Sequence, residues 1–390
     1  MSQKKSKELR LIAVDRYFAG ERVEEICRSL KRSRRWLFKW VARSRSGNPS
    51  WVEEKSRRPR LNPTHPADEV EQIVEMVRLD LYNHGMFCGA QAIRWELDGW
   101  EVSPRPSVRT INRILCRREL TDRRTGRYEP KGKKYPKLEG TSVNRVHQSD
   151  FLGPCFLHGP IRFYSLNTVD LATGRCALEP LLQRSGQHTI DAFWAMWWRL
   201  GLPEHQQVDN EMVFYGSPAH PRGMGTLIRL CLHHGIEPWF IPLGEPWRNG
   251  VVEKFNDHYR QKFLARIEMA SRADLHQQGQ IFEQKHNRCY RYSKLNGRTP
   301  LEQLALSTAV LRFPLEEQAP RYPLPKPEHG KYHVVRFIRS DGQLNIFSEK
   351  FRVPPEAIYE YVTATIDVTE QKLKLYLDQV QVDEIEYRLF

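Results

Sequence analysis

The spacing of apolar residues changes along this chain, and this change sets the strongest limit on how it can fold. Up to about residue 120, apolar side chains recur every three or four positions, as in helices with one buried face. From residue 143 they form short runs rich in β-branched and aromatic residues, which alternate with helical segments. A chain of 390 residues has room for more than one core. The sequence therefore predicts a multidomain protein with N-terminal all-α units and a central α/β domain.

Residues 1–46 predict three short helices with a tight turn before the last. Helical spacing runs from Leu9 to Tyr17, Gly20 interrupts it, and a second short helix runs from Val23 to Leu30. Ser33 is a candidate N-cap for the third helix. This arrangement is a helix-turn-helix, in which the start of the last helix enters the DNA major groove. The candidate DNA-contacting residues there are Arg34, Arg35, Trp36 and Lys39. The alternative is a helical bundle whose basic face is only solvated.

A second helix-turn-helix unit is predicted over residues 67–120, after a proline-containing linker at 47–66. Its last helix is entered from Pro104 and Pro106 and carries a row of arginines. The candidate DNA contacts of this unit are Arg105, Arg109 and Arg113. Two such units in tandem would read a longer DNA site than one unit.

The remaining boundaries follow from changes of composition. Residues 121–142 are basic and poor in apolar groups, which predicts a linker, and residues 143–312 hold the α/β pattern. Residues 313–330 are rich in proline and predict a stiff spacer. In residues 331–390, the stretches 334–338 and 344–353 flank an Asp-Gly turn, and alternating residues follow. This last pattern predicts a small antiparallel β-barrel or sandwich.

The formal charge of +14 is concentrated in two regions. Residues 1–60 carry a net charge of +11 and residues 105–137 carry +9, so the rest of the chain is acidic. This distribution favours a polyanion bound at defined places, because lysines and arginines set on phosphates release condensed counterions. The alternative is two solvated, highly charged faces, and charge alone does not decide between them.

Several classes of protein are disfavoured by the sequence. The 7 cysteines are scattered singly, without the pairing or spacing of a zinc site or a disulfide framework. The first ten residues lack the apolar core of a signal peptide, and no apolar stretch is long enough to cross a membrane. We therefore expect a protein of the reducing cytoplasm without a membrane partner.

Three acidic residues are candidate metal ligands. Asp150 and Asp209 each end a predicted strand, and Glu253 lies one turn into a helix that Asn249 is expected to cap. Mg²⁺ prefers carboxylate oxygens, and two such ions can activate an oxygen nucleophile and stabilise a leaving oxygen in phosphodiester chemistry. On spacing alone, each carboxylate is more often an ordinary capping or surface group.

A series of short motifs runs through the α/β region. They are His147-Gln148-Ser149-Asp150-Phe151, Thr168-Val169-Asp170, Val208-Asp209-Asn210, Gly235-Ile236-Glu237, Pro246-Trp247-Arg248-Asn249-Gly250, Glu253-Lys254-Phe255-Asn256 and Asn296-Gly297-Arg298-Thr299-Pro300. With these motifs, residues from about 143 to 305 resemble the retroviral-integrase-like catalytic core of bacterial insertion-sequence transposases, which has a ribonuclease-H-like fold.

The resemblance implies that Asp150, Asp209 and Glu253 are the DDE triad, with two Mg²⁺ ions or Mn²⁺ in their place. It also implies that the helical units recognise the terminal inverted repeats of an element, and the tail resembles the small β-barrel of Mu-like transposases. The implied activity is DNA transposition: a phosphodiester at the element end is hydrolysed to free a 3′-OH, which is joined to target DNA. The expected partners are double-stranded DNA and further copies of the chain in a dimer or larger assembly. Whether an ATPase helper is a further partner stays open. The implied location is the bacterial cytoplasm, associated with the nucleoid.

The sequence departs from the family pattern in two places. Between Asp209 and Glu253 lie 43 residues, more than is usual, and the surplus is expected in a loop at 214–223. Glu211 stands where the family commonly has glycine, so an additional carboxylate is expected near the metals.

Other roles stay open at this point. The basic residues Arg248, Lys254 and Arg260 are candidates for contact with the DNA end, and solvated side chains are the equal alternative. Two other functions fit the same fold. One is a catalytically silent DNA-binding repressor or domesticated relative, and the other is a ribonuclease-H-like nuclease without strand transfer.

Overall fold

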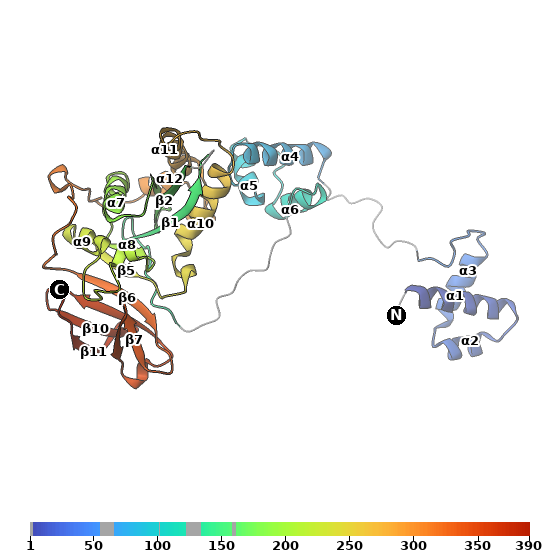
Figure 1. Cartoon of the computed structure of the whole chain (residues 1–390). Coiled ribbons are helices and arrows are strands. Elements are labelled where there is room, and N and C mark those ends of the chain that lie inside the picture. Colours follow the sequence, from blue (N-terminus) through green and yellow to red (C-terminus); the bar gives the residue numbers. More distant parts are fainter. Residues whose placement is uncertain (1–2, 55–65, 101, 122–133, 158–160) are drawn as a thin grey trace. The chain divides into compact units, whose positions relative to one another are not determined.

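The computed structural model describes residues 3–54, 66–100, 102–121, 134–157 and 161–390 (Figure 1). The chain divides into two compact units, Met1–Pro66 and Ala67–Phe390. Much of the expected linker at 47–66 and of the expected linker at 121–142 lies outside the described residues.

The first unit consists of the three predicted helices, α1 (Gln3–Phe18), α2 (Val23–Leu30) and α3 (Arg34–Ser44). Their apolar faces meet in a small core around Leu37 and Trp40. The hydroxyl of Ser33 accepts a hydrogen bond from the Trp36 amide at 3.2 Å, which confirms Ser33 as the N-cap of α3.

The second unit begins with another three helices, α4 (Asp68–Asn83), α5 (Ala90–Gly99) and α6 (Val108–Arg117). They enclose a core of their own around Val74, Ile93 and Ile111. This group is also fixed to later helices of the same unit. Phe87 packs edge-on against Tyr290 at 4.9 Å, and the Tyr290 hydroxyl donates to the Gly85 carbonyl at 2.7 Å.

The α/β region that follows is a mixed sheet covered by helices. Its strands are β1 (Val146–Phe156), β2 (Arg162–Asp170), β3 (Cys176–Leu181), β4 (His205–Val208) and β5 (Glu237–Phe240). Its helices are α7 (Gly186–Leu200), α8 (Met212–Tyr215), α9 (Thr226–His233), α10 (Gly250–Tyr259), α11 (Arg272–Cys289) and α12 (Pro300–Ala305). β1, β2 and β3 pair antiparallel, whereas β1, β4 and β5 pair parallel. None of the helices in the described ranges combines the length and apolar character of a membrane span.

The two faces of this sheet bury two separate cores, because successive strand residues point to opposite faces. Phe151 and Tyr164 join the core that α7 and α9 cover. Their neighbours Leu152 and Phe163 join the core that α10 and α11 cover. Figure 1 shows α7 and α9 on one side of β1 and α10 on the other. A side chain at the end of β1 therefore faces α10 only in alternate positions.

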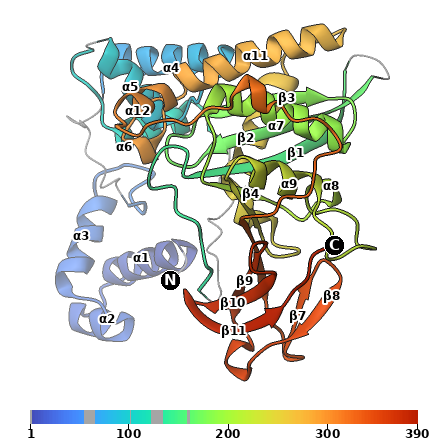
Figure 2. The ribbon, with the colours of Figure 1, turned by 90° about the vertical axis from the view of Figure 1, so that its left-hand side faces the viewer.

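The C-terminal strands continue the same sheet (Figure 2). They are β6 (Lys331–Phe337), β9 (Tyr361–Asp367), β10 (Lys372–Leu377) and β11 (Val380–Glu386), whereas β7 (Gln343–Ile346) and β8 (Glu349–Arg352) form a separate two-stranded sheet. β6 pairs parallel with β5, and the order across the sheet is β11-β10-β9-β6-β5-β4-β1-β2-β3. Leu373 and Leu375 share the core of α7 and α9. The antiparallel strands of the tail are thus observed, while a closed small barrel over 331–390 stays a prediction.

Two details of this region differ from the sequence-based expectation. The stretch 344–353 is a hairpin of β7 and β8, because Phe347 and Ser348 adopt positive φ angles of 46° and 79° and reverse the chain. The expected loop at 214–223 starts inside α8. There Phe214 is fully buried against Phe151, and the Tyr215 ring stacks on Phe347 at 4.4 Å. Apolar packing onto the tail therefore holds the start of this insertion.

The proline-rich segment 313–330 packs against α9. The Arg229 guanidinium donates to the Leu324 carbonyl at 2.8 Å, and the His233 ring lies 3.1 Å from the Pro325 carbonyl oxygen. Leu324 itself is buried. The segment thus leads the chain along α9 to the start of β6.

A glycine fixes the first helical group of the second unit to the α/β region. Gly297 has a φ of +83°, and a Cβ atom there would lie 2.8 Å from Nε1 of Trp95 in α5. We expect Gly297→Ala to lower the free energy of unfolding by about 2–4 kcal/mol, through backbone strain and displacement of the indole. Urea unfolding measures this. Gly174→Ala is the matched control, because Gly174 has a φ of +72° but open space around it. Equal losses in the two variants would contradict the contact.

An ionic contact joins β5 to β6. The His333 Nε2 lies 3.0 Å from a Glu237 carboxylate oxygen, and the His205 Nδ1 lies 3.4 Å from the same oxygen. The hydrogen bond with His333 lowers the pKa of Glu237 below its ordinary value of 4.5 despite partial burial.

This lowered pKa predicts an acid-dependent contribution to stability. A carboxyl group with a lowered pKa in the folded state stabilises the fold above its ordinary pKa, and this stabilisation is lost as the pH falls through the folded value. We therefore expect Glu237→Gln to flatten the fall in unfolding free energy below about pH 4.5, as measured by denaturant titration across pH. Glu328→Gln, at an exposed site, is the control. An unchanged acid slope in Glu237→Gln would contradict this role.

Candidate active site

Asp150 and Asp209 follow the paired residues of the parallel strands β1 and β4. Asp209 comes directly after β4, as expected, whereas Asp150 lies inside β1, which continues to Phe156, and does not end its strand. The register pairs His147 with Gln206 and Gln148 with Gln207. Counting two positions onward places Asp150 beside Asp209, and adjacent strands lie about 4.8 Å apart. By the alternation described above, both positions point to the sheet face that α10 covers.

The helix that carries Glu253 is anchored to β1 by Gln148, a residue of the motif around Asp150 to which the sequence assigned no role. The Gln148 Oε1 accepts hydrogen bonds from the amides of Val251 and Val252, at 3.1 and 3.3 Å, and so caps the start of α10. The expectation that Asn249 caps this helix is wrong. Asn249 has φ −97° and ψ 25°, not the extended backbone of a capping residue, and its amide donates to the Ser149 carbonyl at 2.9 Å.

Asp150 and Glu253 line one groove of about 460 Å³. The same groove is lined by Lys254, Asp257 and Arg260, and Lys254 pairs loosely with Asp257 at 3.8 Å. Arg260 follows α10 in a π-helical turn, Arg260–Leu264. Lys254 and Arg260 both line this groove, and their contact with DNA stays a prediction.

The electrostatics show that the acidic groups are close together and poorly neutralised. Burial raises the pKa of Asp150 to about 7, and the negative charges of Asp209, Glu253 and Glu211 add to this effect. Burial, followed by the charge of Glu211, raises the pKa of Asp209 to about 6. Like charges held out of water disfavour ionisation, so a bound cation would relieve an unfavourable arrangement.

The donor set of this site fits a hard divalent cation. Its side chains offer carboxylate oxygens, and Mg²⁺ retains several waters and needs only one or two carboxylates from the protein. Across the described ranges, no three or more acidic, histidine or cysteine side chains are already arranged as a metal-binding group. The structure thus holds two half-buried carboxylates, Asp150 within β1 and Asp209 directly after β4, with Glu253 on the wall of the groove that Asp150 lines.

A chain of buried hydrogen bonds orients Asp150. The Ser165 hydroxyl donates to Asn167 at 2.7 Å, the Asn167 amide donates to the Asn256 Oδ1 at 2.7 Å, and the Asn256 amide donates to the Asp150 Oδ2 at 2.8 Å. Asn256 lies in the Glu253-Lys254-Phe255-Asn256 motif, so the sequence pointed to it without a role. Nothing in the sequence pointed to Ser165 or Asn167.

We expect Asn256→Ala to weaken divalent metal binding by about 10- to 100-fold, because groups that orient a ligand carboxylate contribute to affinity to this extent. Calorimetric titration with Mn²⁺ measures the change. Asn345→Ala, at an exposed site in β7, is the control and should bind as the unmodified protein does. An unaltered Mn²⁺ affinity in folded Asn256→Ala would show that this amide does not position the carboxylate.

The additional carboxylate at position 211 is already paired. The Arg184 guanidinium donates to the Glu211 carboxylate at 2.6 Å and lies over the Tyr164 ring at 5.0 Å. The Glu211 amide donates to the Asp209 Oδ1 at 3.2 Å. Arg184 is not part of any motif, so sequence reasoning missed it. Glu211, which stands where the family commonly has glycine, is therefore neutralised by Arg184 next to Asp209.

Arg248, a predicted DNA contact, is held by protein groups. Its guanidinium donates to Glu245 at 2.8 Å and to the Tyr361 hydroxyl at 2.9 Å. It also lies 4.0 Å from the centre of the Tyr135 ring. Arg248 thus holds part of the expected linker at 121–142, around Tyr135, against the sheet, and its contact with DNA stays a prediction.

The other predicted DNA contacts lie at the surface of their helical units. At the start of α3, Arg34 pairs with Glu24, and Arg35 and Lys39 are exposed beside a half-buried Trp36. In the second group, the exposed side chains are Arg105, which pairs with Asp98 at 3.1 Å, and Arg109 and Arg113 on α6. Their contact with DNA stays a prediction.

Comparison with solved structures gives matches to retroviral integrases. The HTLV-2 integrase catalytic core domain in complex with magnesium matches in its trimeric form with 17% identity and a TM-score of 0.33, over 42% of this chain and 98% of that one. Its dimeric form matches with 18% identity and a TM-score of 0.33, over 42% of this chain and 97% of that one. The simian T-cell lymphotropic virus intasome in complex with PP2A regulatory subunit B56 gamma matches with 14% identity and a TM-score of 0.38, over 80% of this chain and 96% of that one.

The comparison of sequences is more local. No curated protein matches this chain. One family model matches the segment that runs from the end of α9, through β5 and Glu253, to the start of α12. Residues 234–300 of this chain match the integrase core domain.

Proposed function

We propose that this protein is a DNA transposase or integrase of the DDE type, from a bacterial insertion sequence, and that Asp150, Asp209 and Glu253 hold its metal ions. The observation that carries the proposal is the pair of half-buried, mutually repelling carboxylates of Asp150 within β1 and Asp209 directly after β4, together with Glu253 in the segment that matches the integrase core domain. Structural carboxylates are normally paired with cations, whereas Asp150 and Asp209 accept hydrogen bonds from Asn256 and the Glu211 amide but form no ion pair among the described residues.

The roles of the chain's own residues follow from their places. Asp150 and Asp209 are held on rigid strands, Asn256 orients one carboxylate, and α10 brings Glu253 to the groove. Two Mg²⁺ ions, or Mn²⁺ in their place, would supply charge neutralisation at phosphorus and stabilisation of the leaving oxygen. Lys254 and Arg260 on the groove wall would hold the phosphates of the DNA end. The reaction is hydrolysis that frees a 3′-OH, followed by attack of that hydroxyl on target DNA.

The flanking parts would supply recognition. The two helical units present exposed arginines at the start of α3 and on α6, as expected for groups that read the terminal repeats of an element. Two DNA ends must be held together for joining, so we expect a dimer or larger assembly on DNA. An ATPase helper fits the same scheme for target selection.

The test is a joining reaction with the full chain. Labelled DNA carrying the sequence that flanks the gene is incubated with a target plasmid and Mg²⁺ or Mn²⁺. We expect labelled strands to become joined to the plasmid, and we expect this joining to require the metal. Cleavage without joining would replace the proposal with a nuclease. Binding without cleavage in either metal would replace it with a catalytically silent DNA-binding protein.

A further inference from the structure

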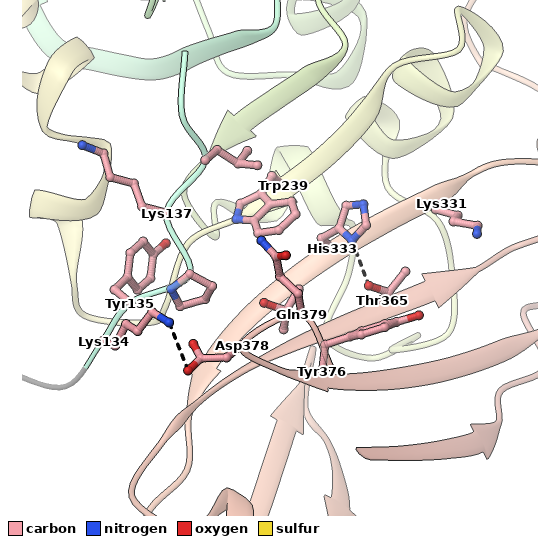
Figure 3. Close-up of a pocket in the computed structure, with 13 residues that line it drawn as sticks. Lys134, Tyr135, Lys137, Trp239, Lys331, His333, Thr365, Tyr376, Asp378 and Gln379 are labelled. Atoms are coloured by element: carbon pink, nitrogen blue, oxygen red, sulfur yellow. Dashed lines mark hydrogen bonds and ion pairs between the residues drawn. The ribbon is translucent and has the colours of Figure 1, made fainter. Parts of the chain in front are cut away.

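A second cavity, of about 610 Å³, lies on the α10 face of the sheet, away from the groove of Asp150 and Glu253 (Figure 3). One wall is the segment 134–138, which Arg248 holds through Tyr135. The floor is formed by β5, β6 and β9, and the other wall by the end of β10 and the turn to β11. We call this cavity the strap pocket. The proposed reaction assigns it no role.

The strap pocket has aromatic surfaces suited to a flat ring. Trp239 is half-buried on the floor, and its indole lies 4.6 Å from the His333 ring at an angle of 36°. Tyr376 of β10 contributes a second aromatic ring to the lining (Figure 3). The indole nitrogen of Trp239 and the hydroxyl of Tyr135 are both buried and interact with each other, which fixes the indole against the segment that forms one wall.

The charge of the lining favours an anion. Lys134, Lys137 and Lys331 line the pocket, against a single acidic residue, Asp378. Lys134 pairs with Asp378 at 3.2 Å, and Lys331 pairs with Asp367 at 3.3 Å, so both ammonium groups keep exposed faces at the rim. Aromatic rings combined with lysines are the usual means of holding a single-stranded nucleic acid, since bases stack and phosphates meet cations.

The turn between β10 and β11 adds a group that can read a base edge. Asp378 and Gln379 have φ angles of 44° and 72°, a conformation for which such turns usually use glycine, asparagine or aspartate, so Gln379 is the unusual residue. Its side chain lines the pocket beside that of Asp378. Figure 3 shows the Gln379 amide extending towards Trp239. An amide offers one donor and one acceptor side by side, which suits the edge of a nucleobase.

We propose that the strap pocket binds one unstacked nucleotide of a single-stranded DNA segment. Its base lies against Trp239 and meets the Gln379 amide, and the phosphates of the strand on either side of it meet Lys134 at one rim of the pocket and Lys331 at the other. The inference rests on the proposed function only in taking DNA as the source of the nucleotide. The pocket lies near the proposed catalytic residues along the sheet. The register pairs Trp239 of β5 with Gln207 of β4, two residues before Asp209. Gln207 in turn pairs with Gln148 of β1, two residues before Asp150.

The test uses the full chain and a short single-stranded DNA that contains 2-aminopurine, whose fluorescence falls when it stacks on an aromatic ring. We expect saturable quenching by the unmodified protein. Trp239→Leu should weaken the quenching interaction by about 5- to 100-fold, as loss of one base–aromatic stack does. Trp198→Leu, on the surface of α7, is the matched control and should quench normally. Lys331→Ala should weaken binding, whereas Lys350→Ala on β8 should not.

Each outcome of the quenching experiment either supports or contradicts the proposed nucleotide site. Unchanged quenching in folded Trp239→Leu would overturn the proposal, and if that variant unfolds, Tyr376→Leu and Lys331→Ala carry the same test. Competition by free dAMP as strong as by the oligonucleotide would show a site for free nucleotides and overturn the DNA assignment. Asp209→Asn should quench as the unmodified protein does. If joining of DNA fails while Trp239-dependent quenching persists, the proposed function is wrong, but nucleotide binding in the strap pocket is supported.

Discussion

Asp209→Asn should reduce both cleavage and joining of DNA on the order of 10³-fold or more, because asparagine keeps the shape of the side chain but removes the charge that holds a metal ion. Asp150→Asn and Glu253→Gln should each have an effect of similar size. The measurement is the initial rate of labelled strand transfer at saturating Mg²⁺, together with the rate of cleavage of the DNA end. Binding of DNA in the absence of metal should stay unchanged, since the helical units are untouched.

The matched control is Asp257→Asn. Asp257 lines the same groove as Asp150 and Glu253, but it pairs with Lys254 and is not a proposed ligand. This variant should retain activity within about tenfold, a limit of 1.4 kcal/mol in the barrier. Joining by Asp209→Asn at a rate close to that of the unmodified protein would remove the basis of the proposed mechanism.

The second large effect concerns stability. Addition of Mg²⁺ or Mn²⁺ should raise the unfolding temperature of the second unit by several degrees, because binding at 100 times Kd contributes about 2.7 kcal/mol. The physical reason is that the cation neutralises carboxylates that burial and mutual repulsion now disfavour. In Asp150→Asn this response should be largely lost. The metal-free variant should itself be more stable than the metal-free unmodified protein, since one buried charge is gone.

Differential scanning calorimetry with and without EDTA measures this response. NaCl of matched ionic strength is the control for screening, and Asp257→Asn should respond to metal as the unmodified protein does. If NaCl raised the unfolding temperature as much as the divalent cation does, or if Asp150→Asn kept the full rise, the cation would not bind at the carboxylate pair. This test is independent of DNA and of the identity of the element ends.

Individual helices, strands and one helix cap could be predicted from the sequence. The helical spacing around Trp40 and Ile93, the cap at Ser33 and the β-forming runs around Asp150 and Val169 each depend on residues that are neighbours in the chain. Propensity, capping and periodicity act over a few residues, so they can be read without knowledge of the fold. The choice of Asp150, Asp209 and Glu253 as a set was different in kind, because it came from motifs and not from spacing.

The tertiary structure alone decided which groups meet. An apolar pattern states that one face of a strand is buried, but it does not name the strand alongside, so nothing local placed β6 next to β5. Hydrogen-bond partners are likewise chosen by proximity in space: Gln148 caps α10 in place of Asn249, Asn256 orients Asp150, and Tyr135 and Tyr361 enclose Arg248. The sequence by itself determined the helices and strands and the presence of the three acidic residues. The fold determined that these carboxylates lie close enough to repel one another, because electrostatic coupling depends on distance in space and not on separation in sequence.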